Sequence, residues 1–225
     1  MPAGPRFELI TLLAYNELLR LKIGSCPINS STFLTPCEQN IVICSYQEFC
    51  ALTGVPFNKL TLNGRLEDGF YVSEINKLRT MILYNADKYT KRVRFTLLHE
   101  VGHIILNHKR NAPLEEAEAN FFASQFLIPG ALLLEIYRRG YNLDACKLCR
   151  IFDISLACAQ VKIEQFTLRR HITTHLDDRL VRRFTPYLDQ YFPSKTAPIH
   201  NDLHLFGSLE NYRAFQRFED STLFP

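Results

Sequence analysis

The residues His99-Glu100-Val101-Gly102-His103 have the types and the spacing of a metal site that activates water. On an α-helix, side chains at positions i and i+4 project from one face, so His99 and His103 can bind the same ion. Imidazole nitrogens are typical zinc ligands. Glu100 is turned by about 100° from His99. It therefore lies beside the pair, as a base for a metal-bound water rather than as a ligand.

The segment around this motif is predicted to be a buried helix, because it is apolar on nearly all sides. Its apolar residues are Leu97, Leu98, Val101, Ile104, Ile105 and Leu106. Two imidazoles and a carboxylate inside such a helix are unfavourable unless they are paired or bind a metal. A surface helix that carries the motif by chance is the alternative, and the flanking apolar residues argue against it.

A zinc hydrolase usually has a third protein ligand. The pattern HExxHxxGxxH would supply a third histidine, but Leu106 and Lys109 stand at its glycine and histidine positions. That class of zinc site is therefore excluded. His108 falls one residue short of the required position, and we expect it at the surface near the end of the helix.

The next predicted helix offers three carboxylates, Glu115, Glu116 and Glu118. On a helical wheel, Glu116 lies near the middle of the apolar arc, where a carboxylate without a cation would be very unfavourable. Glu115 and Glu118 fit an acidic helix start that interacts with the helix dipole, and we expect them to face solvent. Asn120, one turn after Glu116, suits accepting a hydrogen bond from a ligand imidazole. Glu116 is therefore the expected third ligand.

The elements that must position these residues form an α+β pattern. The predicted helices are residues 6–22, 46–52, 89–108, 114–128, 131–139, 143–152 and a longer stretch from 155 onward. The predicted strands are residues 41–45 and a hairpin formed by 64–72 and 79–85.

The composition is that of an ordinary globular protein. The 225 residues are 47% hydrophobic and 22% charged, which excludes a disordered or fibrous chain. The net charge of +3 is too small to indicate nucleic-acid binding by itself. We see no signal peptide and no membrane-spanning stretch. Seven cysteines, an odd number, in a chain without a signal peptide indicate reduced thiols and a cytoplasmic protein. The lack of a spanning stretch predicts no membrane partner.

Two segments resemble the ImmA/IrrE-type metallopeptidases. They are RFTLLHEVGHIILNH and EAEANFFASQFLIP, and the family pattern is R-F-T-x-x-H-E-x-G-H, then E-x-E-A-N-x-F-A and a Leu-x-x-Pro-like end. The matching residues are Arg94, Phe95, Thr96, His99, Glu100, Gly102, His103, Glu116, Glu118, Ala119, Asn120, Phe122, Ala123, Leu127 (shifted by one residue) and Pro129. The likeness covers about residues 6–166 and is strongest over 79–129.

The resemblance implies a small zincin-like metallopeptidase domain with zinc at His99, His103 and Glu116 and with Glu100 as the catalytic base. It also implies a cytoplasmic protein of a bacterium or phage whose substrates are helix-turn-helix transcriptional repressors. The expected division is a peptidase domain over 1–130, a helical region over 131–185 and an aromatic, proline-rich tail over 186–225. The residue that stabilises the oxyanion is not placed by spacing. The available residues are Tyr71, Tyr84, Tyr89 and Arg94.

Residues 143–166 look like a helix-turn-helix, with a turn at 153–155 and a second helix capped by Ser155. They lie in the most basic part of the chain, so a DNA-binding regulator is the second hypothesis. The second helix offers only Gln160, Lys162 and Gln165 to read bases, and we expect a region that docks a protein substrate rather than nucleic acid. A third hypothesis is a catalytically silent protein that keeps the metal site and binds partners.

Overall fold

The computed structural model describes residues 4–29, 41–61, 66–75, 79–109, 112–169 and 172–195. The predicted tail beyond residue 195 lies outside the described residues. The helices are α1 (Phe7–Arg20), α3 (Tyr46–Thr53), α4 (Thr90–Ile105), α5 (Pro113–Leu127), α6 (Gly130–Arg138), α7 (Ala145–Phe152), α8 (Leu156–Arg169) and α9 (Asp177–Tyr191), with a 3-10 turn at Phe57–Leu60. The strands are β1 (Ile41–Ser45), β2 (Gly69–Ile75) and β3 (Arg79–Tyr84). The α+β prediction is therefore confirmed.

The three strands form one sheet in the order β1-β3-β2. β2 and β3 are the predicted hairpin and pair antiparallel, with Tyr71 opposite Ile82. β1 pairs parallel with β3, with Ile43 opposite Ile82, a pairing that the sequence pattern did not reveal. Among the described strands β2 lies at an edge of the sheet and pairs with one strand only.

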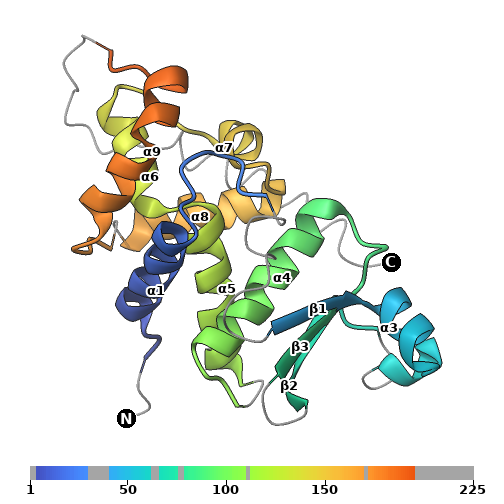
Figure 1. The fold of residues 1–225 in the computed structure, drawn as a ribbon. Coiled ribbons are helices and arrows are strands. Elements are labelled where there is room, and N and C mark those ends of the chain that lie inside the picture. Colours follow the sequence, from blue (N-terminus) through green and yellow to red (C-terminus); the bar gives the residue numbers. More distant parts are fainter. Residues whose placement is uncertain are drawn as a thin grey trace.

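The elements are stacked in layers beside this sheet (Figure 1). α3 covers one face of the sheet, where Tyr46 and Leu83 are buried together. α4 packs against β2 and β3, α5 packs against α4, and α1 packs against α5. The helices α6 to α9 lie at the other end of the molecule. The HExxH helix is thus held between a sheet and a helix that is itself covered.

A single apolar core connects the α4–α5 pair with the helices that follow it. Buried side chains of α4 and α5, such as Leu98 and Phe122, belong to the same cluster as Phe152 of α7 and Leu180 of α9. The Tyr15 hydroxyl also accepts a hydrogen bond from the Ala131 amide at 3.0 Å. The expected peptidase domain and helical region therefore share one core.

The helix α9 does not end where the sequence indicates. Pro186 was expected to begin the tail, but it lies inside α9, which continues to Tyr191. Proline removes one backbone hydrogen bond of a helix. Pro186 is exposed, so water can satisfy the carbonyl that has lost its partner, and the buried Phe184 and Leu188 on the inner face hold the helix.

The helices α7 and α8 and the turn between them form as the sequence predicts. Asp153 ends α7 in the left-handed conformation, with φ of 50°. The Ser155 hydroxyl accepts a hydrogen bond from the Cys158 amide at 3.2 Å, which caps the start of α8. Whether this pair acts as a helix-turn-helix module stays a prediction.

None of the helices in the described ranges alone combines the length and apolar character needed to cross a bilayer. α5 and α6 reach that length and apolar character only as a pair, which is bent by 41°.

Candidate metal centre

The close packing of α4 on α5 brings the candidate ligands together. A Cβ atom added at Gly102 would lie 3.2 Å from Phe122 Cβ and 3.3 Å from Ala119 Cα. Only glycine allows the two helices to approach this closely without a shift. Gly102 lies between His99 and His103 along α4. This contact therefore determines which side of α5 lies opposite the two imidazoles.

Three donor atoms converge at this crossing. His99 Nε2 and His103 Nε2 are 3.0 Å apart. Glu116 places one oxygen 3.3 Å from His99 Nε2 and the other 3.3 Å from His103 Nε2. Bonds of about 2.0–2.1 Å at tetrahedral angles would separate two ligand atoms by roughly 3.3 Å. The three residues therefore fit a single zinc-sized ion, and together they are the candidate metal cluster among the residues described.

The imidazoles are in the protonation state that a metal requires. Burial lowers the pKa of His99 below its usual value. Burial first, and then the neighbouring rings of His99 and His108, lower the pKa of His103 to about 4. Both rings are therefore neutral at pH 7 and can offer a lone pair. Asn120 Oδ1 lies 2.9 Å from His99 Nδ1, as expected for an acceptor behind a ligand.

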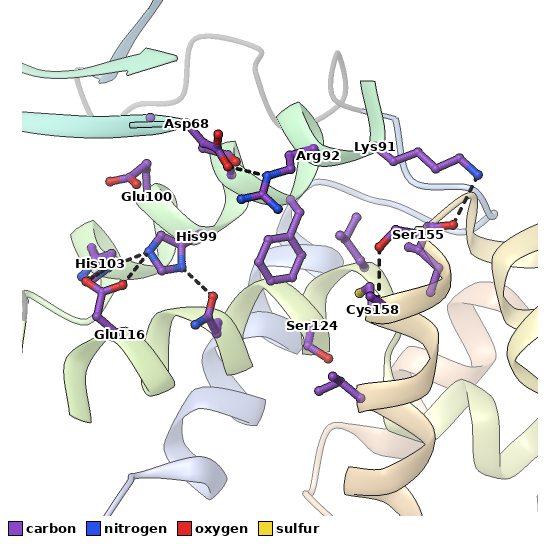
Figure 2. A pocket seen from close by; sticks show the side chains of 18 of the residues that line it. Asp68, Lys91, Arg92, His99, Glu100, His103, Glu116, Ser124, Ser155 and Cys158 are labelled. Atoms are coloured by element: carbon purple, nitrogen blue, oxygen red, sulfur yellow. Dashed lines mark hydrogen bonds and ion pairs between the residues drawn. The ribbon is translucent and has the colours of Figure 1, made fainter. Parts of the chain in front are cut away.

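Glu116 was selected from the sequence for a reason that the structure does not support. Its side chain is 38% exposed and lines a cavity rather than the centre of a buried face. The wheel misleads because α5 is buried on nearly all sides from Glu118 onward. Figure 2 shows Glu116 pointing toward His99 and His103.

The expectation that Glu118 faces solvent is wrong. Its side chain is 2% exposed and forms an ion pair with Arg6, whose Nη2 atom lies 2.6 Å from Oε2. The Arg6 amide also donates to Glu118 Oε1 at 2.8 Å. The hydrogen bonds from Arg6 lower the pKa of Glu118 to about 2, which keeps the carboxylate charged although it is buried.

The expectation that His108 lies at the surface is also wrong, since its side chain is 2% exposed. The chain reverses after α4, where Asn107 adopts a left-handed conformation with φ of 54°. His108 N then donates to His103 O at 3.0 Å and Asn107 N to Ile104 O at 3.1 Å. This is the Schellman pattern, which folds the residue after the turn back onto the last turn of the helix.

Glu100 has the environment of a general base. It lies on α4 and lines the same cavity as the three donors (Figure 2). Burial, and then the Glu116 carboxylate, raise the pKa of Glu100 to about 7, while a hydrogen bond from the Tyr71 backbone opposes this rise. A base with a pKa near the working pH is the most effective in proton transfer.

The four residues considered for stabilising the oxyanion differ in whether they line the cavity. Tyr71 and Tyr89 line the cavity, whereas Tyr84 and Arg94 do not. Arg94 is buried and donates to the carbonyls of Phe152 and Asp153, so it ties α4 to the turn before α8. The Tyr71 hydroxyl donates to His108 O at 2.6 Å, and its ring stacks on His103.

The cavity, which we call the cleft, has a volume of about 1020 Å³ and extends from the donors to α8. Its metal end is lined by Tyr71, His99, Glu100, His103 and Glu116. Its far end is lined by Phe95, Leu127, Cys158, Val161 and Gln165. The helical region thus forms one wall of the same cavity that holds the catalytic candidates.

Two neutral imidazoles, one carboxylate and a nearby base opening into a cleft are the residue set of metal-dependent hydrolases. The family model of the IrrE N-terminal-like domain, Peptidase_M78, matches residues 50–164, just over half of the chain. The chain therefore belongs to this peptidase family, which confirms the resemblance to the ImmA/IrrE proteins. A search among curated proteins finds no match.

Sequence reasoning missed the residues that support the site from behind: Arg6, His108 and Glu118. The second glutamate of the family pattern is Glu118, but nothing in the pattern states its role. The local signal for His108 was Asn107, a common left-handed residue at helix ends. Arg6 gave no signal, because it pairs with a residue 112 positions away.

Proposed function

We propose that this protein is a zinc-dependent endopeptidase that cleaves a protein substrate in the cytoplasm. The observation that carries the proposal is the convergence of His99, His103 and Glu116, with donor atoms 3.0–3.3 Å apart, beside a buried base. His₂Glu sets with an open position are used by zinc peptidases. The zinc ion, when bound, would polarise the attacking water and the scissile carbonyl.

The residues of this chain then have separate tasks. His99, His103 and Glu116 hold the ion, and Asn120 accepts the Nδ1 proton of His99. A Glu100 carboxylate oxygen takes a proton from the attacking water and returns it to the leaving amine nitrogen. Its pKa of about 7 suits both steps.

The shape of the cleft supports an extended peptide as the substrate. The edge strand β2 contributes Gly69, Phe70 and Tyr71 to the cleft wall, and an edge strand can pair with a peptide backbone. The far end offers Val161, which is 50% exposed, for an apolar side chain. Gln165 also lines this end of the cleft.

The same arrangement favours a substrate-binding task for α8 over DNA reading. Of its three expected base readers, Lys162 is buried at 2% exposure and donates to Gln125 Oε1 at 3.1 Å. Gln165 lines the cleft. A helix that reads bases has to present such side chains to the major groove.

The substrate that we propose, on the strength of the family resemblance, is a helix-turn-helix repressor. The test is co-expression with candidate helix-turn-helix repressors, beginning with any that is encoded beside the gene of this protein, followed by mass spectrometry of the fragments. Glu100→Gln keeps the shape of the side chain and removes the base, so zinc content should remain while cleavage falls by about 10²-fold or more. Cleavage at the unaltered rate by this variant would contradict the hydrolytic mechanism, and absence of activity in the unaltered protein would favour the catalytically silent alternative.

A further inference from the structure

The His103 ring has polar contacts on both of its nitrogen atoms. Nε2 faces the other donors of the metal centre, 3.0 Å from His99 Nε2 and 3.3 Å from Glu116 Oε1. Nδ1 points the opposite way and lies 3.0 Å from His108 Nδ1. The Schellman turn at Asn107 produces this contact, because it returns His108 to the residue at the start of the last helical turn.

Metal binding at Nε2 fixes the proton positions along this contact. A neutral imidazole carries one proton, so His103 must hold it on Nδ1 when Nε2 offers its lone pair. Nδ1 of His108 must then accept this proton in a hydrogen bond, and the proton of His108 must lie on its Nε2. That nitrogen is 3.1 Å from Glu118 Oε2, a carboxylate that can only accept.

The far end of this chain of hydrogen bonds is anchored by a cation. Arg6 donates to both oxygens of Glu118, at 2.6 Å to Oε2 and 3.1 Å to Oε1. Arg6 Nη2 also lies 3.4 Å from His108 Nε2, which is longer than the contact of that nitrogen with Glu118. Since the side chains of His108 and Glu118 are each 2% exposed, water does not compete for the bond between them, whereas Arg6 lies half exposed at the end of the network.

The second imidazole of the centre has a weaker support. His99 Nδ1 contacts Asn120, a neutral and exposed side chain. The His103 ring is backed instead by the buried His108 and Glu118 side chains and by the stacked ring of Tyr71. Partners behind a ligand fix its ring orientation and raise its basicity. The stronger support lies behind His103.

We propose that His108 and Glu118 are positioning residues for His103 and that Arg6 holds them in place. This inference rests on the proposed metal site. It assigns a task to the second glutamate of the E-x-E-A-N segment, which carries the charge at the end of the network. It also makes metal affinity depend on a residue that precedes the first helix.

The test measures zinc affinity of the metal-free protein by competition with a chromogenic chelator. His108→Leu removes the acceptor for His103. His108→Asn also loses the bond to Glu118, but its amide oxygen can take the place of Nδ1. Both variants lose the same structural contact, so a difference in zinc affinity between them reports the acceptor alone. Glu118→Gln removes the charge, and Glu115→Gln on the same helix is the matched control.

We expect His108→Leu to raise the zinc Kd by about 10–100-fold, His108→Asn to recover much of this loss, and Glu118→Gln to raise it by about 10-fold. Glu115→Gln should leave it within about twofold. Thermal melting identifies variants that remain folded. If His108→Leu does not fold, the comparison of His108→Asn and Glu118→Gln with the control decides.

Folded variants of His108 and Glu118 that bind zinc as tightly as the unaltered protein would overturn the inference and leave the proposed function intact. An unaltered protein that binds no zinc would overturn the proposed function and the inference together.

Discussion

A lysine buried beside the cleft provides a test of the packing of α8. Lys162 is 2% exposed, and its Nζ atom donates to Gln125 Oε1 at 3.1 Å. Burial lowers the pKa of Lys162 from 10.5 to about 7. One pKa unit is worth about 1.4 kcal/mol, so holding this amine inside the protein costs about 4 kcal/mol of folding stability at pH 7. We expect Lys162→Met, which keeps an unbranched stem, to be more stable than the unaltered protein at that pH.

The sign of the pH dependence follows from the two pKa values. Between about pH 7 and 10.5 the unfolded lysine binds a proton that the folded one does not, so the free energy of unfolding rises with pH in this window. Below about pH 7 both states are protonated and the cost of burial is constant. The advantage of Lys162→Met should therefore shrink from about 4 kcal/mol at pH 7 to below about 1 kcal/mol at pH 10.5.

Urea unfolding of both proteins at one-unit steps from pH 6 to 10 measures this difference. Subtracting the two free energies of unfolding at each pH cancels the contributions of the other titrating groups, which both proteins share. Gln125 keeps a partner in the variant, since the Gly130 amide also donates to its Oε1 at 3.3 Å. A stability difference that stays constant from pH 7 to 10 would refute the reasoning, because it would mean that Lys162 titrates as an exposed lysine does.

Three other predictions concern the site. Glu116→Gln should lose most of the bound zinc, as measured by metal analysis after dialysis, whereas full retention would remove it from the ligand set. Glu118→Gln should lower the free energy of unfolding by about 2 kcal/mol, because it weakens the charged hydrogen bonds between the buried carboxylate and the half-exposed Arg6; a urea midpoint equal to that of Glu115→Gln would contradict this. Val161→Glu should raise KM for the protein substrate by about 10-fold without changing zinc affinity. The control Leu52→Glu, on the exposed face of α3, should change neither quantity. Equal KM values for the two variants would exclude the far end of the cleft from substrate binding.

The helix that carries the HExxH motif could be predicted from local sequence alone. The spacing of His99, Glu100 and His103 is set by the helix, and the apolar residues around them indicate burial whatever the rest of the fold is. The hairpin and the helix order also follow from local patterns. The parallel pairing of β1 with β3 does not, since it joins strands whose residues are about 40 positions apart.

Each error concerns a residue whose surroundings lie outside the helix that carries it, where a helical wheel gives no information. A helical wheel predicts that Glu118 faces solvent, but its carboxylate is buried, because Arg6 neutralises its charge. His108 reads as the polar end of a helix, and it is buried because the chain turns at Asn107. Glu116 faces the two imidazoles, but it does not lie in an apolar arc, which a wheel cannot locate when a helix is covered on nearly all sides.

The shared core determines the shortest fragment of this protein that can keep its cleft. A chain ending at residue 130 would lose Cys158, Val161 and Gln165, and with them one wall of the cavity. It would also expose apolar side chains that now pack against Phe152, Leu180 and Phe192. Removing or exchanging the helical region would therefore disrupt the core and the cleft. A fragment that keeps both has to extend at least through Phe192.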